Sequence, residues 1–197
     1  TTFGVAPGCL DLAVMDSTDP GAVLAATERL DLDRTLFIVS TKSGGTIETL
    51  SLFKYCYNLV LDKTGAENAG RHFVAVTDPG SSLAAVAATC HFRKIFLNDP
   101  DVGGRYSALT LFGLAPAALI GLDVGRLLGS AQEALAAETD ASGADRPEVL
   151  SGLYLGAVLG QMAKAGRDKA TFLISPQIES FGAWLEPALA QRLDDCV

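Results

Sequence analysis

Short apolar segments rich in β-branched residues alternate along this chain with longer segments of helical periodicity. The clearest apolar segments are residues 35–40 (TLFIVS), 71–77 (RHFVAVT) and 170–175 (ATFLIS), with weaker candidates at 12–15 and 93–97. They show little polar alternation, which is typical of strands covered on both faces. The alternation predicts an α/β fold: a three-layer αβα sandwich around a mainly parallel sheet of about five strands.

Helical patterns of ordinary length separate these strands. Asp19 and Pro20 form an N-cap and N1 pair that opens a helix running to about Leu30. Residues 46–61 carry apolar side chains near the 3.6-residue period. Further helices are expected at 81–89, 106–120, 124–139, 148–165 and 180–192. The polar loop 139–147 is too short for a domain linker, so residues 1–197 are predicted to form a single domain.

Composition excludes several classes of protein. With 197 residues, 49% of them hydrophobic, the chain can bury the core of one domain. Its net charge is -8 and its basic residues are scattered, so no nucleic-acid partner is expected. The four cysteines lack metal or redox spacing and the N-terminus carries no secretory signal. We therefore expect a cytoplasmic protein with no metal and no cofactor.

One apolar stretch approaches the length of a membrane span. Residues 106–122 are uncharged over 17 positions, close to the roughly 18 that would indicate a spanning helix. Pro116 interrupts the stretch, and Arg105 and Asp123 flank it. A helix enclosed in an α/β core can be apolar on all sides, so we expect a buried helix and no membrane partner.

The segment that carries chemistry follows the first clear strand. The strand 35–40 runs into residues 41–46 (TKSGGT) and then directly into a helix. This places hydroxyls, glycines and a lysine at the carboxyl end of a strand, where open α/β sheets bind ligands. A phosphate needs converging donors and positive charge, and a helix N-terminus, hydroxyls and one ammonium supply them. Two glycines allow the main chain to approach closely.

A plainer interpretation of the same segment is structural. Hydroxyl residues are common at helix N-caps, so Thr41, Ser43 and Thr46 could cap a helix while Lys42 is solvated. Neither a Walker pattern nor a G-x-G-x-x-G run after a strand occurs in the sequence. Nucleotide binding is therefore not expected.

Two segments resemble a known family. Residues 40–49 (STKSGGTIET) resemble the S-K-T-x-T-T-x-E-T signature of glucose-6-phosphate isomerases and their sugar isomerase (SIS) domain. Residues 102–107 (VGGRYS) resemble that family's V-G-G-R-[FY]-S motif. Residues 77–79, the apolar helix after Arg105 and residues 168–186 are also similar to bacterial isomerases, especially those fused to transaldolase. The resemblance implies an SIS-like fold, a phosphorylated hexose as substrate and a homodimer.

The resemblance also assigns roles to individual residues. Those that would bind the phosphate of the sugar are Thr41, Lys42, Ser43 and Thr46, and Gly104 would contact the substrate. Thr41 and Ser43 stand where the family more often has Ser and Thr, which preserves both hydroxyls. Gly44 and Gly45 depart further, because Gly45 lacks a hydroxyl that the signature often supplies.

Two residues are implied in catalysis. Glu48 matches the glutamate that supports a catalytic histidine in the family; alternatively it is a first-turn acid favoured by the helix dipole. Arg105 matches the arginine that stabilises negative charge on an enediolate; alternatively it forms a salt bridge beside the apolar helix.

The sequence departs from the family where the base should be. The family moves a proton between C2 and C1 with a glutamate in a Q-x-x-x-E-S-x-G-K run after F-G-x-W-x-E. Here residues 181–186 are intact, but Pro187 replaces the glutamine and Gln191 occupies the position of the base. The glycine-rich loop expected before Leu12 is also missing.

Three hypotheses therefore remain. The chain is a glucose-6-phosphate isomerase or its N-terminal SIS domain, converting glucose 6-phosphate to fructose 6-phosphate through an enediol. Alternatively, it is a non-catalytic module that binds a phosphosugar. The third hypothesis is a degenerate remnant that keeps only packing and dimer surfaces.

Overall fold

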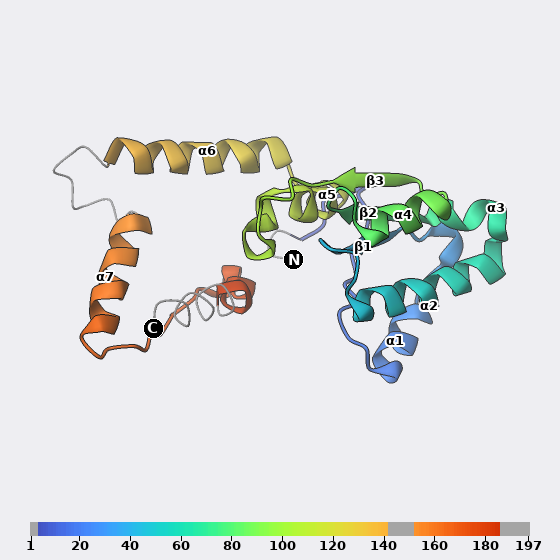
Figure 1. Cartoon of the computed structure of the whole chain (residues 1–197), viewed down its shortest axis with the longest axis horizontal. Coiled ribbons are helices and arrows are strands. Elements are labelled where there is room, and N and C mark those ends of the chain that lie inside the picture. The colour runs from blue at the N-terminus through green and yellow to red at the C-terminus, as the bar shows by residue number, and fades with distance from the viewer. Residues whose placement is uncertain (1–3, 142–151, 186–197) are drawn as a thin grey trace. The chain divides into compact units, whose positions relative to one another are not determined.

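The computed structural model describes residues 4–141 and 152–185. The chain divides into two compact units (Figure 1). Residues 5–122 form the first, which we call the sheet unit, and residues from 123 onward, together with the N-terminal residues up to 4, belong to the second, the helical unit.

The sheet unit is built on a parallel sheet. Its strands are β1 (Phe37–Ser40), β2 (Phe73–Thr77) and β3 (Lys94–Leu97), in the order β1-β2-β3. Phe37 pairs with Phe73 across β1 and β2, and Val74 pairs with Lys94 across β2 and β3. The predicted mixed α/β class with a parallel sheet is confirmed. Because all strands run the same way, their carboxyl ends meet at one edge of the sheet.

Helices precede, connect and follow the strands of the sheet unit. They are α1 (Pro20–Thr27), α2 (Ile47–Thr64), α3 (Ala66–Ala69), α4 (Ser82–Thr89) and α5 (Leu111–Leu119), with 3₁₀ turns η1 (Leu32–Arg34), η2 (Gly70–His72) and η3 (Gly104–Leu109). The predicted start of the first helix is confirmed, because Asp19 Oδ1 accepts a hydrogen bond of 2.8 Å from Ala22 N and Pro20 follows the cap. Both α2 and α4 contribute side chains to the same buried cluster against the sheet.

The apolar stretch after Arg105 differs from its prediction. It forms η3 first and then α5, because Thr110 ends the 3₁₀ turn and its hydroxyl accepts a bond of 3.3 Å from Phe112 N. A single helix over 106–120 was therefore wrong at its start. Most residues of α5 are half-buried, and α5 contacts β2. Among the described residues, no helix is long and apolar enough to span a bilayer.

The helical unit contains no strand within its described residues. Its elements are α6 (Val124–Ala141), α7 (Gly152–Lys164), η4 (Pro176–Ile178) and a helical stretch at residues 180–185. The strand predicted at 170–175 is wrong, as is the weaker one at 12–15, so three strands are seen among the described residues where about five were expected. Leu173 is 96% exposed, and β-branched composition alone does not make a strand without a hydrogen-bonded neighbour. The remainder of the helix predicted at 180–192 lies outside the described residues.

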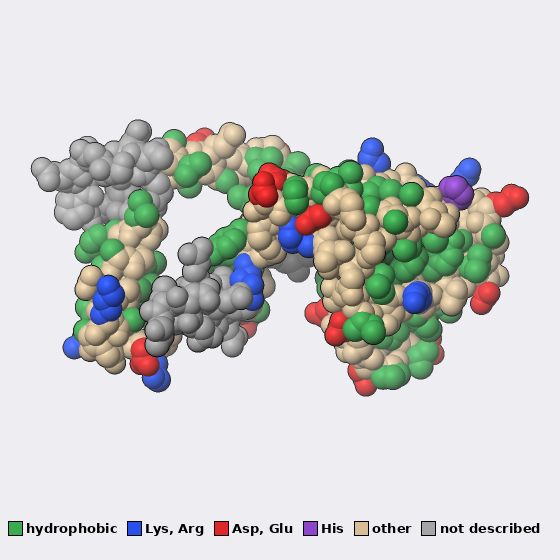
Figure 2. Space-filling view, in the orientation of Figure 1, with side chains coloured by type: hydrophobic (Ala, Val, Ile, Leu, Met, Phe, Trp, Pro, Cys, Tyr) green, Lys and Arg blue, Asp and Glu red, His purple; other side chains and the backbone are tan. Residues whose placement is uncertain are grey.

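Charged side chains are dispersed on the visible surface. Figure 2 shows Lys and Arg side chains scattered among acidic and apolar ones on the face that it draws. This distribution agrees with the scattered basic residues of the sequence.

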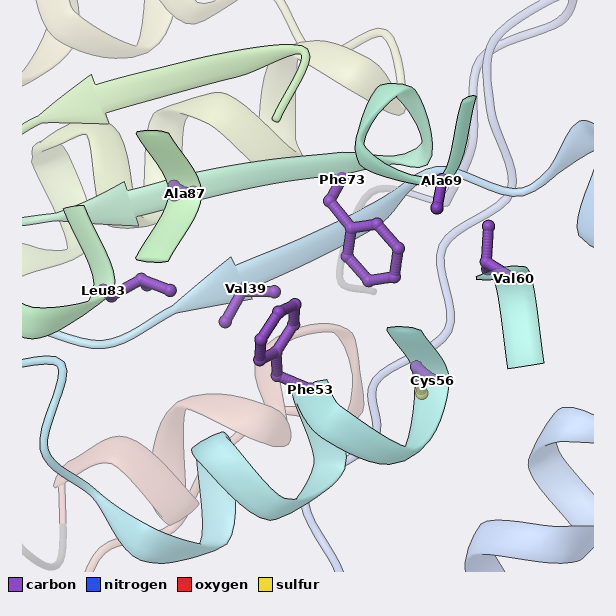
Figure 3. Close-up of a cluster of buried hydrophobic side chains, with 9 residues drawn as sticks. Val39, Phe53, Cys56, Val60, Ala69, Phe73, Leu83 and Ala87 are labelled. Carbon is purple, nitrogen blue, oxygen red and sulfur yellow. The ribbon is translucent and has the colours of Figure 1, made fainter. Parts of the chain in front are cut away.

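Phe73 stands at the centre of the hydrophobic core (Figure 3). Its ring is fully buried, stacks on Phe37 at 5.0 Å between centroids, and meets Phe53 edge-on at 5.7 Å. The buried members of this core are Val39, Phe53, Cys56, Val60, Ala69, Phe73, Ala75, Leu83 and Ala87. Burial also raises the pKa of the Cys56 thiol, so Cys56 acts as a small apolar side chain.

We expect Phe73→Ala to lower the free energy of unfolding by about 3–5 kcal/mol, because it removes a ring from a fully buried aromatic cluster. Leu24→Ala is the control: Leu24 is 51% exposed, and its loss should cost less than about 1 kcal/mol. Urea unfolding followed by circular dichroism measures both. Equal losses for the two variants would show that Phe73 is not central to the core.

Candidate functional site

The loop between β1 and α2 continues along the end of β2. Thr41 N donates to Val76 O at 3.1 Å, and Asp78 N donates to Lys42 O at 3.2 Å. Thr41 is buried, with 9% of its surface exposed. The main chain of residues 41–42 is thus held at the carboxyl edge of the sheet, as the sequence predicts.

Gly44 fixes the course of this loop. Its φ is +72°, and a Cβ built on it would lie 2.4 Å from Leu83 N and 2.7 Å from Ser82 Oγ. The loop therefore packs directly against the start of α4, and any side chain at position 44 would collide with backbone. At Gly45 a Cβ would meet only Ser43 Oγ at 3.8 Å. The two glycines consequently differ: position 44 has no room for a side chain, whereas position 45 has room for one.

The hydroxyls of the loop do not cap α2. Thr46 is the N-cap residue of α2, yet its side chain makes no capping hydrogen bond. Its Oγ1 instead lies 3.4 Å from Thr41 Oγ1, while Ser43 Oγ accepts a bond of 3.2 Å from Gly45 N. Among the described residues, the N-cap side chain thus leaves the N–H groups that open α2 uncapped, and such groups favour an anion. This geometry argues against the plain capping interpretation of Thr46.

Lys42 is where the two recognisable segments meet. Its Nζ lies 2.7 Å from Asp78 Oδ2 and donates to Pro100 O at 3.4 Å. A Cβ built on Gly104 would lie 3.9 Å from Lys42 Cδ. The loop after β1 and the 102–107 segment, far apart in sequence, are therefore adjacent at the side chain of Lys42.

Three residues of this edge were not predicted as functional. Thr77 is fully buried, and its Oγ1 donates toward Thr41 O at 2.7 Å and Lys42 O at 3.2 Å. It also lies 2.7 Å from Ser81 Oγ, which caps α4 by accepting from Ala84 N. Asp78 supplies the partner of Lys42. A hydroxyl and a carboxylate at the end of the strand predicted at 71–77 were the signal that could have identified them.

Buried polar atoms without a hydrogen-bond partner also lie at this edge of the sheet. Within the described chain, Asp78 Oδ1 and both amide atoms of Asn98 are buried without a hydrogen-bond partner. Asn98 follows β3 directly, and its N–H donates to Thr77 O at 2.9 Å. Buried polar groups are normally paired, so this edge holds polar atoms that the fold itself does not satisfy.

The two residues assigned to catalysis are exposed, unlike the buried residues at the edge of the sheet. Glu48 lies in the first turn of α2 and Arg105 follows Gly104 in η3, and both side chains are exposed. Their roles stay predictions. Gln191 and Pro187 lie outside the described residues. In the part of the chain that the structure describes, no group of three His, Cys, Asp or Glu side chains is arranged to hold a metal ion.

The fold and this edge together define an α/β protein with a candidate anion-binding loop at the carboxyl ends of parallel strands. Residues 5–164 match the family model described as phosphoglucose isomerase. The chain belongs to the phosphoglucose isomerase family.

Individual relatives agree with the family model. A glucose-6-phosphate isomerase from Prochlorococcus marinus (strain NATL2A) is 31% identical over 186 residues, which are 93% of this chain and 35% of that protein. One from Carboxydothermus hydrogenoformans is 38% identical over 121 residues, covering 61% of this chain and 26% of that relative. The chain thus spans only 26% to 35% of the length of these two relatives.

Solved structures share the fold. A hypothetical protein from Thermus thermophilus aligns with a TM-score of 0.65 and 33% identity, over 74% of this chain and 34% of that one. A glucose-6-phosphate isomerase from Chlamydia trachomatis aligns with a TM-score of 0.66 and 25% identity, over 85% of this chain and 31% of that one.

Gly44→Ala should destabilise the sheet unit by about 1–3 kcal/mol, because the left-handed backbone is strained for alanine and its Cβ meets the backbone of α4. Gly45→Ala is the matched control and should change stability by less than about 0.5 kcal/mol. Thermal unfolding of both variants measures the difference. If the two variants unfold alike, the loop does not pack on α4 as described.

Proposed function

We propose that this chain provides the phosphosugar-binding part of a glucose-6-phosphate isomerase, which interconverts glucose 6-phosphate and fructose 6-phosphate through an enediol. The observation that carries the proposal is that Gly104 adjoins Lys42 of the loop 41–46: a Cβ built on Gly104 would lie 3.9 Å from Lys42 Cδ. Family membership supports the same activity.

The phosphate of the sugar would bind at the start of α2. The first-turn N–H groups carry the positive end of the helix dipole. The hydroxyls of Thr41, Ser43 and Thr46 would donate to phosphate oxygens, and the Lys42 ammonium would add charge. Gly104 would lie beside the sugar, since it adjoins the Lys42 side chain.

The Lys42–Asp78 pair limits how much charge reaches the phosphate. Their side chains are 29% and 16% exposed, and the pair is 2.7 Å apart, so the carboxylate balances much of the ammonium charge. A doubly charged phosphate would therefore depend on the helix N-terminus as well as on Lys42. Asp78 would hold the ammonium in position before the ligand arrives.

Catalysis by this chain alone is the weaker half of the proposal. Arg105 would stabilise the enediolate with its permanent charge, and Glu48 would support a histidine. Gln191 cannot accept a proton at neutral pH, whereas aldose–ketose isomerisation needs a base. The second candidate function, a phosphosugar-binding module without turnover, follows from that substitution.

The wider setting follows from the family. We propose that the chain forms a single SIS-type domain in a three-layer αβα arrangement, and that the protein is a cytoplasmic homodimer. A homodimer is the commonest symmetric assembly of soluble proteins, and its interface could contain the active site.

Lys42→Ala should weaken fructose 6-phosphate binding by about tenfold or more, since it removes a charge-assisted hydrogen bond to the phosphate. Lys54→Ala is the matched control, because Lys54 is an exposed residue of α2 away from the loop. Isothermal titration calorimetry measures both affinities. Equal affinities for wild type and Lys42→Ala would contradict the proposed phosphate site, and no binding at millimolar ligand would favour the degenerate remnant.

The 197-residue chain should bind fructose 6-phosphate without measurable turnover. A coupled assay that reduces NADP⁺ as glucose 6-phosphate forms measures this directly. Robust turnover would contradict the assignment of Gln191 to the base position. In that case Arg105→Gln should lower kcat strongly and change KM little, because the charge of Arg105 acts on the enediolate and not on the bound substrate.

A further inference from the structure

A polar cavity that is open to solvent lies at the opposite edge of the sheet from the loop 41–46. Its volume is about 440 Å³, and its lining includes Lys63, Arg71, His72 and Arg93. Arg71 and His72 directly precede β2, and Arg93 directly precedes β3. At about 3.3 Å per residue, the five residues of β2 place this cavity roughly 16 Å from the carboxyl edge. The cavity is therefore separate from the loop 41–46.

Positive charge dominates this cavity, although the chain as a whole carries a net charge of -8. Two arginines, one lysine and one histidine line it, against a single carboxylate, Asp33. Asp33 lies 3.5 Å from Lys63 Nζ, and both side chains are more than half exposed. Within the described residues, neither Arg71 nor Arg93 has a carboxylate partner.

Hydrogen bonds to main-chain carbonyls hold two of these side chains in place. Arg93 Nε donates to Arg71 O at 2.6 Å, which fixes the arm of the guanidinium and leaves its terminal nitrogens for another acceptor. His72 Nδ1 lies 3.1 Å from Thr35 O. A guanidinium with a fixed arm loses little entropy when it binds an oxyanion with its fork.

Compensation of helix dipoles explains only one of the three basic residues in this cavity. Lys63 lies in the last turn of α2, where a cation compensates the negative end of the helix dipole. Arg93 stands four residues beyond the last residue of α4, and Arg71 belongs to the short turn η2. Helix ends therefore do not account for two arginines that lack a carboxylate partner among the described residues and line one cavity.

We infer that this cavity binds a small anion with at least two negative charges, either a phosphate compound or a polycarboxylate. The oxyanion groups of both ligand classes fit guanidinium forks. Three cations against one carboxylate leave a net charge of about +2 with His72 neutral, which matches such a ligand. The cavity is open to solvent and has a volume of about 440 Å³, which leaves room for a small hydrated anion. This site is independent of the isomerase proposal.

Titration calorimetry of the 197-residue chain with inorganic pyrophosphate and with citrate tests the site. Arg71→Gln is the decisive variant, because it keeps the main-chain carbonyl that accepts from Arg93 Nε. We expect it to weaken binding of the preferred anion by about tenfold or more. Lys54→Gln should leave that affinity within about twofold. Preference for pyrophosphate over citrate identifies a phosphate ligand, and the reverse identifies a polycarboxylate.

Three results would overturn the inference. The first is absence of binding for both anions at millimolar concentration. The second is binding that Lys42→Ala abolishes and Arg71→Gln leaves intact, which places the anion in the loop 41–46. The third is a lowered melting temperature for Arg71→Gln with unchanged affinity, which assigns the residue to stability alone.

Discussion

The hydroxyl of Thr77 joins the parts on which the candidate site depends. It is fully buried and donates toward the carbonyls of Thr41 and Lys42, so the end of β1 is tied to the end of β2. Through Ser81 the same network reaches the cap of α4. Because a buried hydroxyl without partners would carry a desolvation cost, this arrangement favours one course of the main chain. The hydrogen bonds of Thr77 thus fix the position of the loop that precedes α2.

The Lys42–Asp78 pair gives this edge its electrostatic character. A carboxylate 2.7 Å from the ammonium lowers the net charge available to an anion but restricts where the ammonium can lie. Such preorganisation reduces the ordering cost of binding. The buried, unpaired atoms of Asp78 and Asn98 add polar capacity beside it. The edge thus combines fixed positive charge with groups whose hydrogen bonding the fold leaves open.

Local sequence patterns predicted secondary structure correctly where neighbouring elements pack against or pair with the segment. The strand at 35–40 and the helix opened by Asp19 and Pro20 were predictable, because apolar runs and caps are local features. Val39 of the strand belongs to the buried core, and Val23 of the helix is buried. The segment 170–175 carries a similar apolar run, yet no neighbouring strand pairs with it among the described residues. A strand is defined by its partner as much as by its own residues, and the sequence does not state the partner.

The sequence by itself determined the alternation of strands and helices, the placing of residues 41–46 after a strand, and the family. These depend on contiguous residues and on motifs in a fixed order. Only the tertiary structure decided that Asp78 pairs with Lys42, that Gly44 packs against α4, and that Arg71 and Arg93 share a cavity with Lys63. Each of these joins residues from separate elements, so each depends on the register of the sheet and on how the helices pack.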